Sequence, residues 1–373
     1  MKVVVIIPTY NEVENIKLLI PALLKEFVNI SQHDLHILVV DGNSPDGTGR
    51  VVDELGREND HIHLLTEKKK AGLGAAYIVG FEHAMNHLQA EVLVEMDADF
   101  QHDPKDLSRM FKVFDQGYDY IIGSRFVRGG SIPKQWALYR KFLSLAGSQF
   151  SKLVLGVYGV NDFTTGFKIS RVRGFVDKID FRSINSSGFA YKIDLLYKMH
   201  LLGARIKEVP IQFGLRDRGD SKMEKDNALD SLRVVMLLRY QKSRSFFRFV
   251  SVGFIGLFVD SGLFSLLRVT LVGSSLASAL SGLVAMLTTF ILNNYWSFGE
   301  RKLSGFRKKL TSFAVYFGSS YLPIIFRSFL IRYSIGIFGD TALVAYSAFF
   351  VGILVGLIWN YTVYSRVIWK KTG

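Results

Sequence analysis

Cysteine is absent from this chain of 373 residues. Its absence excludes disulfide bonds, zinc sites with thiolate ligands and cysteine nucleophiles. The N-terminus lacks a secretion signal as well, because the apolar run at 3–7 is too short and no small-residue cleavage pattern follows it. We therefore expect the first domain to begin and remain in the cytoplasm.

Acidic residues are outnumbered, with 33 Asp and Glu against 46 Lys and Arg, and the apolar residues are spread unevenly. From Phe246 onward apolar stretches dominate, whereas charged and apolar residues mix before it as in a soluble domain. The length suits two domains. We expect a soluble domain over 1–225, an interfacial helix over 226–245 and a membrane domain over 246–373.

The first half alternates between strand and helix patterns. Strand patterns cover 3–7, 35–40, 62–65 and 92–96. Helical spacing covers 12–27, 48–58 and 74–90. This alternation indicates an α/β domain with a parallel, doubly wound sheet, in which ligands bind beyond the carboxyl ends of the strands.

Four apolar segments follow, at 246–272, 276–298, 310–338 and 341–369. Each is long enough for a transmembrane helix, which needs about 20 residues. Core helices of a soluble domain are the alternative, but four such lengths in succession are rare in soluble cores. Basic residues flank these segments, whereas the loops 273–275 and 339–340 contain none. The positive-inside rule therefore places the first domain and the C-terminus on the cytoplasmic side.

Two carboxylates, Asp97 and Asp99, stand two residues apart directly after the strand pattern at 92–96. At a strand end both can turn into one crevice, and hard oxygen ligands of this kind suit Mg²⁺ or Mn²⁺ bridging to substrate phosphates. An Asp-x-Asp pair alone is also common in surface turns. Its weight here comes from the polar loops that follow the first two strands, at 8–12 and 41–48.

We expect some residues of these loops to bind ligands and others to form local structure. Asp41, at a strand end, is a candidate ligand-binding residue, whereas we expect Asp46 and Thr48 to form a turn and a helix cap. The stretch 68–74 is either a solvated charge run with a turn or a site close to a diphosphate.

Several of these motifs match a known family. The stretches 8–12, 41–48, 72–74 and 97–102 resemble the inverting transferases of glycosyltransferase family 2, which have the GT-A (Rossmann-like) fold. More narrowly, they look like the dolichol-phosphate mannose synthases and the polyprenyl-phosphate glucosyltransferases. The C-terminal part resembles the four-helix, GtrA-like transmembrane domain, with the sequence Asn-Asn-Tyr-Trp-Ser-Phe at 293–298 as its clearest mark.

The resemblance implies a set of site residues. The nucleotide-sugar would be bound by Pro8, Tyr10, Glu12, Val40, Asp41, Asp97, Ala98, Asp99, Gln101, Lys192, Arg216 and Lys222. Mg²⁺ or Mn²⁺ would be held by Asp97, Asp99 and Gln101. Catalysis would depend on Asp97, Asp99, Arg125 and Arg140, with the two arginines receiving the acceptor phosphate through their forked donors. The chain departs from the family at Gly42, where a second acidic residue is common, and at Ala190, where some relatives carry lysine.

The implied reaction moves mannose from GDP-mannose to dolichyl or another polyprenyl phosphate, releasing GDP. A lipid monophosphate is already anionic near neutral pH, so it needs no strong base. Transfer of glucose from UDP-glucose is the alternative, and a flippase for the lipid-linked sugar is a more remote one. We expect the bilayer as a partner, self-association through the membrane domain, and no nucleic-acid partner.

Two segments, 139–156 and 226–244, mix basic and apolar residues. Each either lies in the membrane interface, where it would guide the lipid acceptor, or packs on the catalytic domain. Four ionisable residues also fall inside the expected spans: Asp260, Arg268, Arg327 and Arg332. We expect these four to pair within the helix bundle or to reach toward the span ends.

Overall fold

The computed structural model describes residues 1–215, 227–269, 274–339 and 341–370. Two of the expected site residues, Arg216 and Lys222, lie outside the described residues. The chain divides into two compact units, Met1–Arg239 and Tyr240–Gly373. The boundary falls inside the segment expected to form an interfacial helix.

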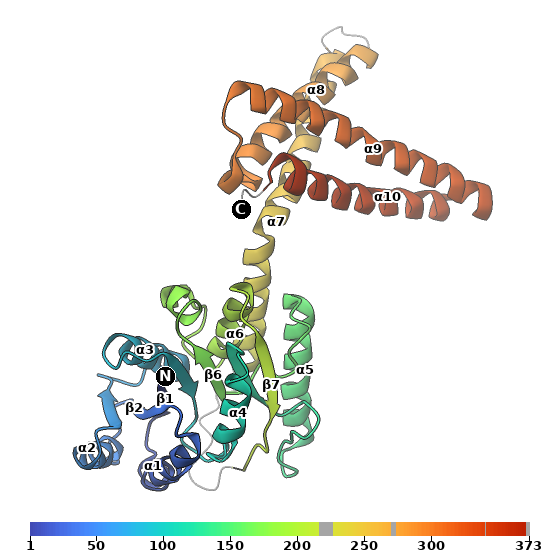
Figure 1. Ribbon diagram of the computed structural model, residues 1–373. Coiled ribbons are helices and arrows are strands. Elements are labelled where there is room, and N and C mark those ends of the chain that lie inside the picture. Colours follow the sequence, from blue (N-terminus) through green and yellow to red (C-terminus); the bar gives the residue numbers. More distant parts are fainter. Residues whose placement is uncertain (216–226, 270–273, 340, 371–373) are drawn as a thin grey trace. The chain divides into compact units, whose positions relative to one another are not determined.

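The first unit contains a seven-stranded sheet with the strand order β3-β2-β1-β4-β6-β5-β7. Strands β1, β2, β6 and β7 of this sheet are labelled in Figure 1. The strands are β1 (Lys2–Thr9), β2 (Asp34–Asp41), β3 (Ile62–Thr66), β4 (Val92–Glu95), β5 (Tyr120–Ser124), β6 (Lys168–Arg171) and β7 (Ile206–Pro210). The helices between them are α1 (Val13–Phe27), α2 (Thr48–Glu58), α3 (Leu73–Asn86), α4 (Asp106–Phe114), α5 (Leu138–Leu155) and α6 (Tyr191–Leu201).

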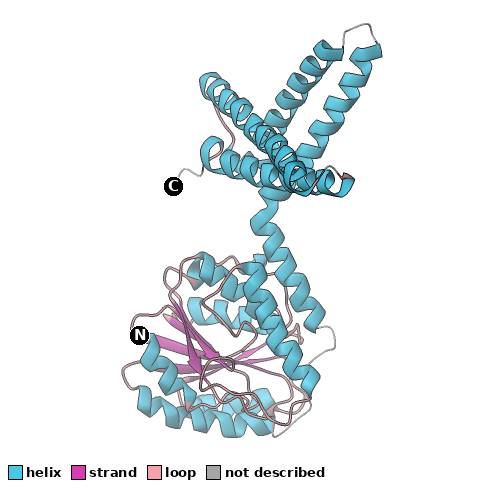
Figure 2. Cartoon of the chain, turned by 90° about the vertical axis from the view of Figure 1, so that its right-hand side faces the viewer, coloured by secondary structure: helices cyan, strands magenta, loops and turns pink. Residues whose placement is uncertain are grey.

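The central strands are continuous apolar runs because helices cover both faces of the sheet (Figure 2). Alternate residues of β1 face opposite sides. Val3 and Val5 pack with residues of α1 and α4, whereas Val4 and Ile6 pack with residues of α3 and α6. All four are fully buried. The expected α/β fold is therefore confirmed.

One strand that the sequence did not predict, β6, departs from the expected parallel arrangement. β6 runs antiparallel to both β4 and β5, whereas β1, β2, β3 and β4 pair in parallel. The segment after α5 returns to the carboxyl edge, where the backbone N–H of Gly123 donates to the carbonyl of Phe167 at 2.8 Å. A strand that starts at that edge must run in the opposite direction. This reversal places the loop 162–167 beside the carboxyl ends of the parallel strands.

The second unit is helical. Its elements are α7 (Asn227–Val269), which begins in the first unit, α8 (Ser274–Leu292), α9 (Phe306–Phe338) and α10 (Ala342–Val363). Within the described part of the chain, three helices are long and apolar enough to cross a membrane: Asn227–Leu267, Phe306–Phe338 and Phe350–Ile368. The expected span at 276–298 is not among them. Its regular helix ends at Leu292 and continues as a π-helical turn, Asn293–Ser297.

The contacts of Asn294 show what an asparagine does in the motif at 293–298. Its buried Oδ1 accepts the backbone N–H of Leu303 at 2.7 Å and the indole N–H of Trp369 at 2.9 Å. Phe298 stacks on Trp369 with ring centres 4.8 Å apart. Asp260 of α7 accepts the hydroxyl of Ser281 of α8 at 2.6 Å, as expected for pairing within a bundle.

Candidate active site

The carboxyl ends of β1, β2 and β4 lie at one edge of the sheet, and a polar turn follows each. Each turn contains one non-glycine residue with a left-handed backbone: Asn11 (φ 55°), Asn43 (φ 59°) and Phe100 (φ 60°). Such a conformation costs on the order of 1–3 kcal/mol and persists only where the surrounding structure holds it, often at binding sites. Left-handed residues thus occur in all three turns at this edge, and one more, Gln89 (φ 55°), precedes β4 at the other edge.

Asp97 is held by groups from separate elements. The Tyr77 hydroxyl of α3 donates to its Oδ1 at 3.0 Å, and the Lys192 ammonium of α6 lies 3.6 Å from its Oδ2. The backbone N–H of Asp97 donates to Nδ1 of His102 at 3.2 Å. Burial lowers the pKa of His102 and outweighs the nearby carboxylates, so this ring is a neutral acceptor. The structure thus brings together two expected site residues, Asp97 and Lys192.

Gly166 makes this approach sterically allowed. A Cβ on Gly166 would lie 2.4 Å from Nζ of Lys192 and 2.9 Å from Oδ2 of Asp97. Both distances are shorter than any real contact of that kind. Gly166 belongs to the loop that β6 brings back to the carboxyl edge. A side chain here would have to push Lys192 or Asp97 out of position.

Asp99, Ala98 and Gln101 continue the turn. Asp99 is only 4% exposed, and its Oδ1 accepts the backbone N–H of Gln101 at 3.1 Å. The Gln101 side-chain nitrogen donates to the carbonyl of Gly214 at 3.3 Å, and the Gly214 N–H returns a bond to the Gln101 carbonyl. The amide of Gln101 therefore fastens the turn to the segment after β7. Its expected role as a metal ligand stays a prediction.

A buried charged layer lies beneath Asp97, and sequence reasoning missed it. Glu95 ends β4 and accepts the Tyr191 hydroxyl at 2.7 Å, while the Lys168 ammonium donates to the Lys192 carbonyl at 3.0 Å. Burial raises the pKa of Glu95 and lowers the pKa of Lys168 to about 8. The available signal was a charged residue inside the apolar run 92–96.

The turn after β2 is built around Asp41, which is 2% exposed. Its carboxylate accepts the Thr9 hydroxyl at 2.9 Å, and it accepts both the backbone N–H and the hydroxyl of Ser44, at 2.9 and 2.5 Å. Val40 precedes it and pairs with Pro8 in the β1–β2 register. Asp41 therefore joins the first two turns, and its expected contact with the nucleotide is untested.

Tyr10 and Glu12 follow β1. The Lys70 ammonium lies 4.8 Å from the centre of the Tyr10 ring, and a Cβ on Gly42 would lie 3.3 Å from Cδ2 of the same ring. Glu12 accepts the side-chain amide of Asn15 at 2.6 Å and is buried. Gly42, where an acidic residue is common in the family, therefore lies against Tyr10, one of the expected nucleotide-binding residues.

Asp46 and Thr48 have the structural role expected from the sequence. Asp46 accepts the backbone N–H groups of Val13 and Thr48, at 3.1 and 3.0 Å, near the starts of α1 and α2. The two glycines of the 68–74 stretch also have a packing role. A Cβ on Gly72 would lie 2.6 Å from the carbonyl oxygen of Ser187, and one on Gly74 would lie 2.7 Å from that of Gly188. This close approach of two backbones accounts for both glycines without a diphosphate.

Arg125 lies in a buried ion pair. Its side chain is 5% exposed, and it forms a two-point ion pair with fully buried Asp162, with Nε to Oδ2 at 2.8 Å and Nη2 to Oδ1 at 2.7 Å. Nη2 also donates to the Thr164 hydroxyl at 2.7 Å. This ion pair and the bond to Thr164 tie the guanidinium to the loop 162–167. Arg125 therefore holds that loop in place, and its expected contact with the acceptor phosphate stays a prediction.

Arg140, the other expected acceptor-binding residue, lies on α5. Its guanidinium carbon is 3.9 Å from the centre of the Trp136 ring, and the side chain is partly exposed. Beyond it, α5 exposes a row of apolar residues: Leu138, Tyr139, Phe142, Leu143, Leu145, Phe150 and Leu153. The structure thus places a partly exposed arginine beside an unburied apolar helix surface.

Comparison with known protein families agrees with this fold and these motifs. Residues 4–176 match the glycosyl transferase family 2 model, and residues 248–369 match the GtrA/DPMS transmembrane domain. A polyprenol monophosphomannose synthase from Mycolicibacterium smegmatis is 41% identical over 62% of this chain and 84% of its own length. The chain belongs to glycosyl transferase family 2.

Two further relatives extend this result. An undecaprenyl-phosphate mannosyltransferase from Micrococcus luteus is 40% identical over 60% of this chain and 88% of its own length. A dolichol-phosphate mannosyltransferase from Pyrococcus furiosus is 30% identical, and the match covers 84% of this chain and 86% of the relative. The protein is therefore a glycosyltransferase with a membrane domain, as its motifs predicted.

Proposed function

We propose that this protein transfers mannose from GDP-mannose to a polyprenyl phosphate such as dolichyl phosphate, giving the lipid-linked mannose and GDP. The observation that carries the proposal is the Asp97–Asp99 turn at the carboxyl edge, with Lys192 fixed 3.6 Å from Asp97. Acidic and basic groups gathered at such an edge suit a nucleotide diphosphate. The names of the relatives, all mannosyltransferases of polyprenyl phosphates, support the choice of sugar and acceptor.

The donor occupies the turns after β1 and β2 in this proposal. Tyr10 offers an aromatic ring for the base, and Asp41 holds the two turns in a fixed arrangement through Thr9 and Ser44. Pro8, Glu12 and Val40 shape the same edge. Because these groups are preorganised by bonds within the protein, binding would require little rearrangement.

The donor set at Asp97 and Asp99 fits a divalent cation. Both residues offer carboxylate oxygens, the ligands that Mg²⁺ and Mn²⁺ prefer, and the Asp97 side chain is 27% exposed. A bound cation would neutralise charge on the departing diphosphate. Lys192 adds a positive charge beside Asp97. Gly166 leaves room for its ammonium group, and the buried layer of Glu95 and Lys168 lies below.

The acceptor phosphate is the nucleophile. Its second pKa, about 6 for related phosphate esters, leaves it anionic at neutral pH, so the protein need only hold one oxygen in line with the anomeric carbon. Attack in line would invert the configuration at that carbon. Arg140 supplies a positive charge for the phosphate, while Arg125 keeps the neighbouring loop 162–167 in place.

The acceptor must arrive from the bilayer. The apolar surface of α5 suits the headgroup region of a membrane, where apolar side chains enter the lipid and basic ones meet lipid phosphates. We further propose that the catalytic unit and the C-terminus lie on the cytoplasmic side, which the basic loops favour.

The direct test uses the purified full-length protein in detergent with radiolabelled GDP-mannose, polyprenyl phosphate and Mg²⁺ or Mn²⁺. We expect label in an organic-extractable lipid. Asp99→Ala should abolish transfer at saturating metal, whereas Asp103→Ala, which alters an exposed aspartate nearby, should retain most of it. Near-normal turnover of Asp99→Ala would overturn the metal assignment. Movement of lipid-linked sugar across vesicles without transfer would favour a flippase.

A further inference from the structure

The amino edge of the sheet, at the opposite ends of β2 and β3 from Asp97, carries a cluster of histidines. Asp34 and His36 lie on β2. His61 directly precedes β3, and His63 lies within it. In the parallel register Leu38 pairs with His63, and alternate residues face the same side. Asp34, His36, His61 and His63 therefore share one face of the sheet. None of them has a part in the proposed transfer reaction.

The spacing of these groups suits a metal ion. One ligand atom from each of Asp34, His36 and His61 lies within 4.8 Å of the others. Asp34 Oδ2 is 3.2 Å from His36 Nε2, and Asp34 Oδ1 is 3.6 Å from His61 Nδ1. Ligand atoms around a tetrahedral Zn²⁺, at bond lengths near 2.0–2.1 Å, are about 3.3 Å apart. Closing these three groups around one ion requires the His61 ring to turn, because it stacks on His36 with ring centres 4.5 Å apart and its Nδ1 donates to the Leu35 carbonyl at 2.9 Å.

His36 also has the supporting contact that metal-binding histidines use. Its other ring nitrogen, Nδ1, is 3.0 Å from Nε2 of His63. A second hydrogen bond of this kind fixes the ring and its tautomer and strengthens the metal-binding nitrogen.

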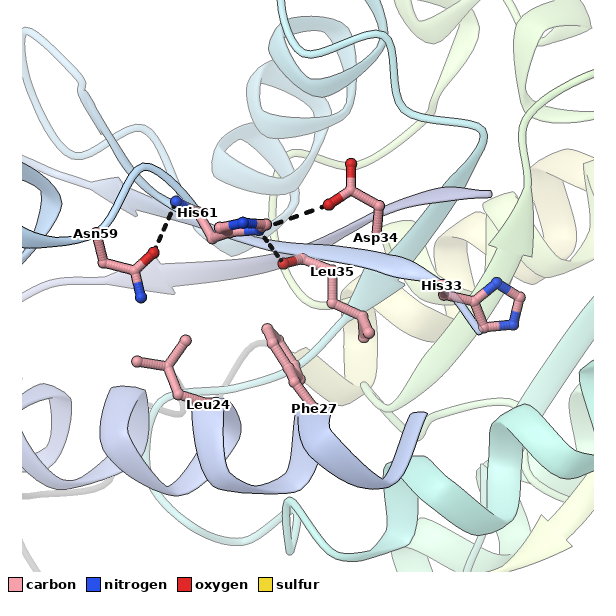
Figure 3. Close-up of a pocket in the computed structure, with 7 residues that line it drawn as sticks. All are labelled: Leu24, Phe27, His33, Asp34, Leu35, Asn59 and His61. Atoms are coloured by element: carbon pink, nitrogen blue, oxygen red, sulfur yellow. Dashed lines mark hydrogen bonds and ion pairs between the residues drawn. The ribbon is translucent and has the colours of Figure 1, made fainter. Parts of the chain in front are cut away.

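The cluster opens onto a hollow. A pocket of about 250 Å³ lies beside it. Asp34, His61 and Asn59 line this pocket with Leu24 and Phe27 of α1 (Figure 3). The side chains of Asp34 and His61 are about half exposed, at 50% and 49%. Water can therefore reach the ion and complete its coordination from this side, while buried His36 anchors it from the sheet.

We propose that Asp34, His36 and His61 form a binding site for a transition-metal dication, Zn²⁺ foremost. Two imidazoles and one carboxylate favour Zn²⁺ over Mg²⁺, which prefers oxygen ligands alone. The site is separate from the Asp97–Asp99 turn. A bound ion would tie the start of β2 to the segment that leads into the edge strand β3, and so stabilise that edge. The proposal does not depend on the identity of the sugar or acceptor.

The test uses full-length protein in detergent, freed of metal by a chelator and of any histidine tag by cleavage. Calorimetric titration with Zn²⁺ should resolve a site, distinct from binding at Asp97–Asp99, whose affinity falls at least about tenfold in His61→Asn and in Asp34→Asn. His83→Asn, on α3, and Asp99→Asn should leave that affinity unchanged. Co²⁺ should give the visible absorption of a low-coordinate nitrogen and oxygen site, and this band should be lost in His61→Asn.

Unchanged Zn²⁺ affinity in both ligand variants would overturn the proposal, and so would loss of the site in Asp99→Asn. Both altered ligands are half exposed, so the variants should fold. Circular dichroism and the metal-free unfolding temperature, matched to the wild type, check that they do. Failure of this site would leave the proposed transfer reaction unaffected, because the assay for transfer measures labelled lipid.

Discussion

At the scale of single residues, the candidate active site depends on how closely its charged groups approach one another. Lys192 is 1% exposed and reaches Asp97 across a glycine that leaves no room for a side chain. The Lys168 and Glu95 side chains fill the space below. A small displacement of any of these groups changes where the charge at the edge of the sheet lies.

Gly166→Ala should therefore lower kcat/KM by about 100-fold, because a shift of about 1 Å at reacting groups can cost that much. The added Cβ meets Lys192 Nζ at 2.4 Å and forces it away from Asp97. Gly159→Ala is the matched control, since a Cβ there meets nothing within 4 Å. Equal activity of the two variants would show that the Lys192–Asp97 approach is unimportant.

The pair between Arg125 and Asp162 should be a major source of local stability. Asp162→Ala leaves a buried guanidinium unpaired, which typically costs about 3–5 kcal/mol. Asp53→Ala breaks the exposed pair with Arg57, whose side chains are 53% and 77% exposed, and should cost less than about 1 kcal/mol. Hydrogen exchange of the β5 and β6 peptides measures the first loss, and that of the α2 peptide measures the second. Similar values would contradict the buried, structural role of Arg125.

The same pair predicts an acid dependence. Burial alone would raise the pKa of Asp162, but the charge and hydrogen bonds of Arg125 outweigh it and hold the pKa below its ordinary value of 3.8. The pair therefore contributes its full stability above pH 3.8 and loses it as the pH falls through the lower native value. The stability difference between wild type and Asp162→Ala should shrink on acidification. A difference that is constant from pH 7 to pH 3 would refute this.

At the scale of elements, the sequence predicted β1 to β4 and α1 to α3 closely, because their apolar runs and turn residues are local signals. It could not predict that β6 is antiparallel, since strand direction depends on where a long connection returns. Local patterns likewise carry no information on partners distant in sequence. The ion pair between Arg125 and Asp162, which is 37 residues further on, is an example.

Helix α5 is the element whose apolar surface should meet the membrane. Phe142→Ser combined with Leu145→Ser removes exposed side chains, at 69% and 46%, so the fold should not suffer. We expect transfer to long polyprenyl phosphates to fall more than transfer to short soluble analogues. Leu18→Ser, which changes an exposed leucine of α1, should affect neither. Equal loss for long and short acceptors would count against a membrane-facing α5.

At the scale of the whole molecule, the absence of cysteine allows the proposed orientation to be tested with single introduced thiols. Ser304→Cys lies in the basic loop between α8 and α9, and Thr341→Cys lies at the start of α10. In sealed vesicles an impermeant thiol reagent should label Cys at these two positions from opposite sides, with position 304 on the cytoplasmic side. Labelling of both from one side would refute the topology and its span count.

The most direct test of the central claim is a competition among donors. Purified protein is given polyprenyl phosphate and radiolabelled GDP-mannose, with unlabelled GDP-mannose, UDP-glucose or GDP-glucose as competitors, and the extracted lipid is counted. The account predicts labelled polyprenyl-phosphate mannose, suppressed strongly by GDP-mannose and weakly by UDP-glucose. Transfer from labelled UDP-glucose in preference to GDP-mannose would contradict it.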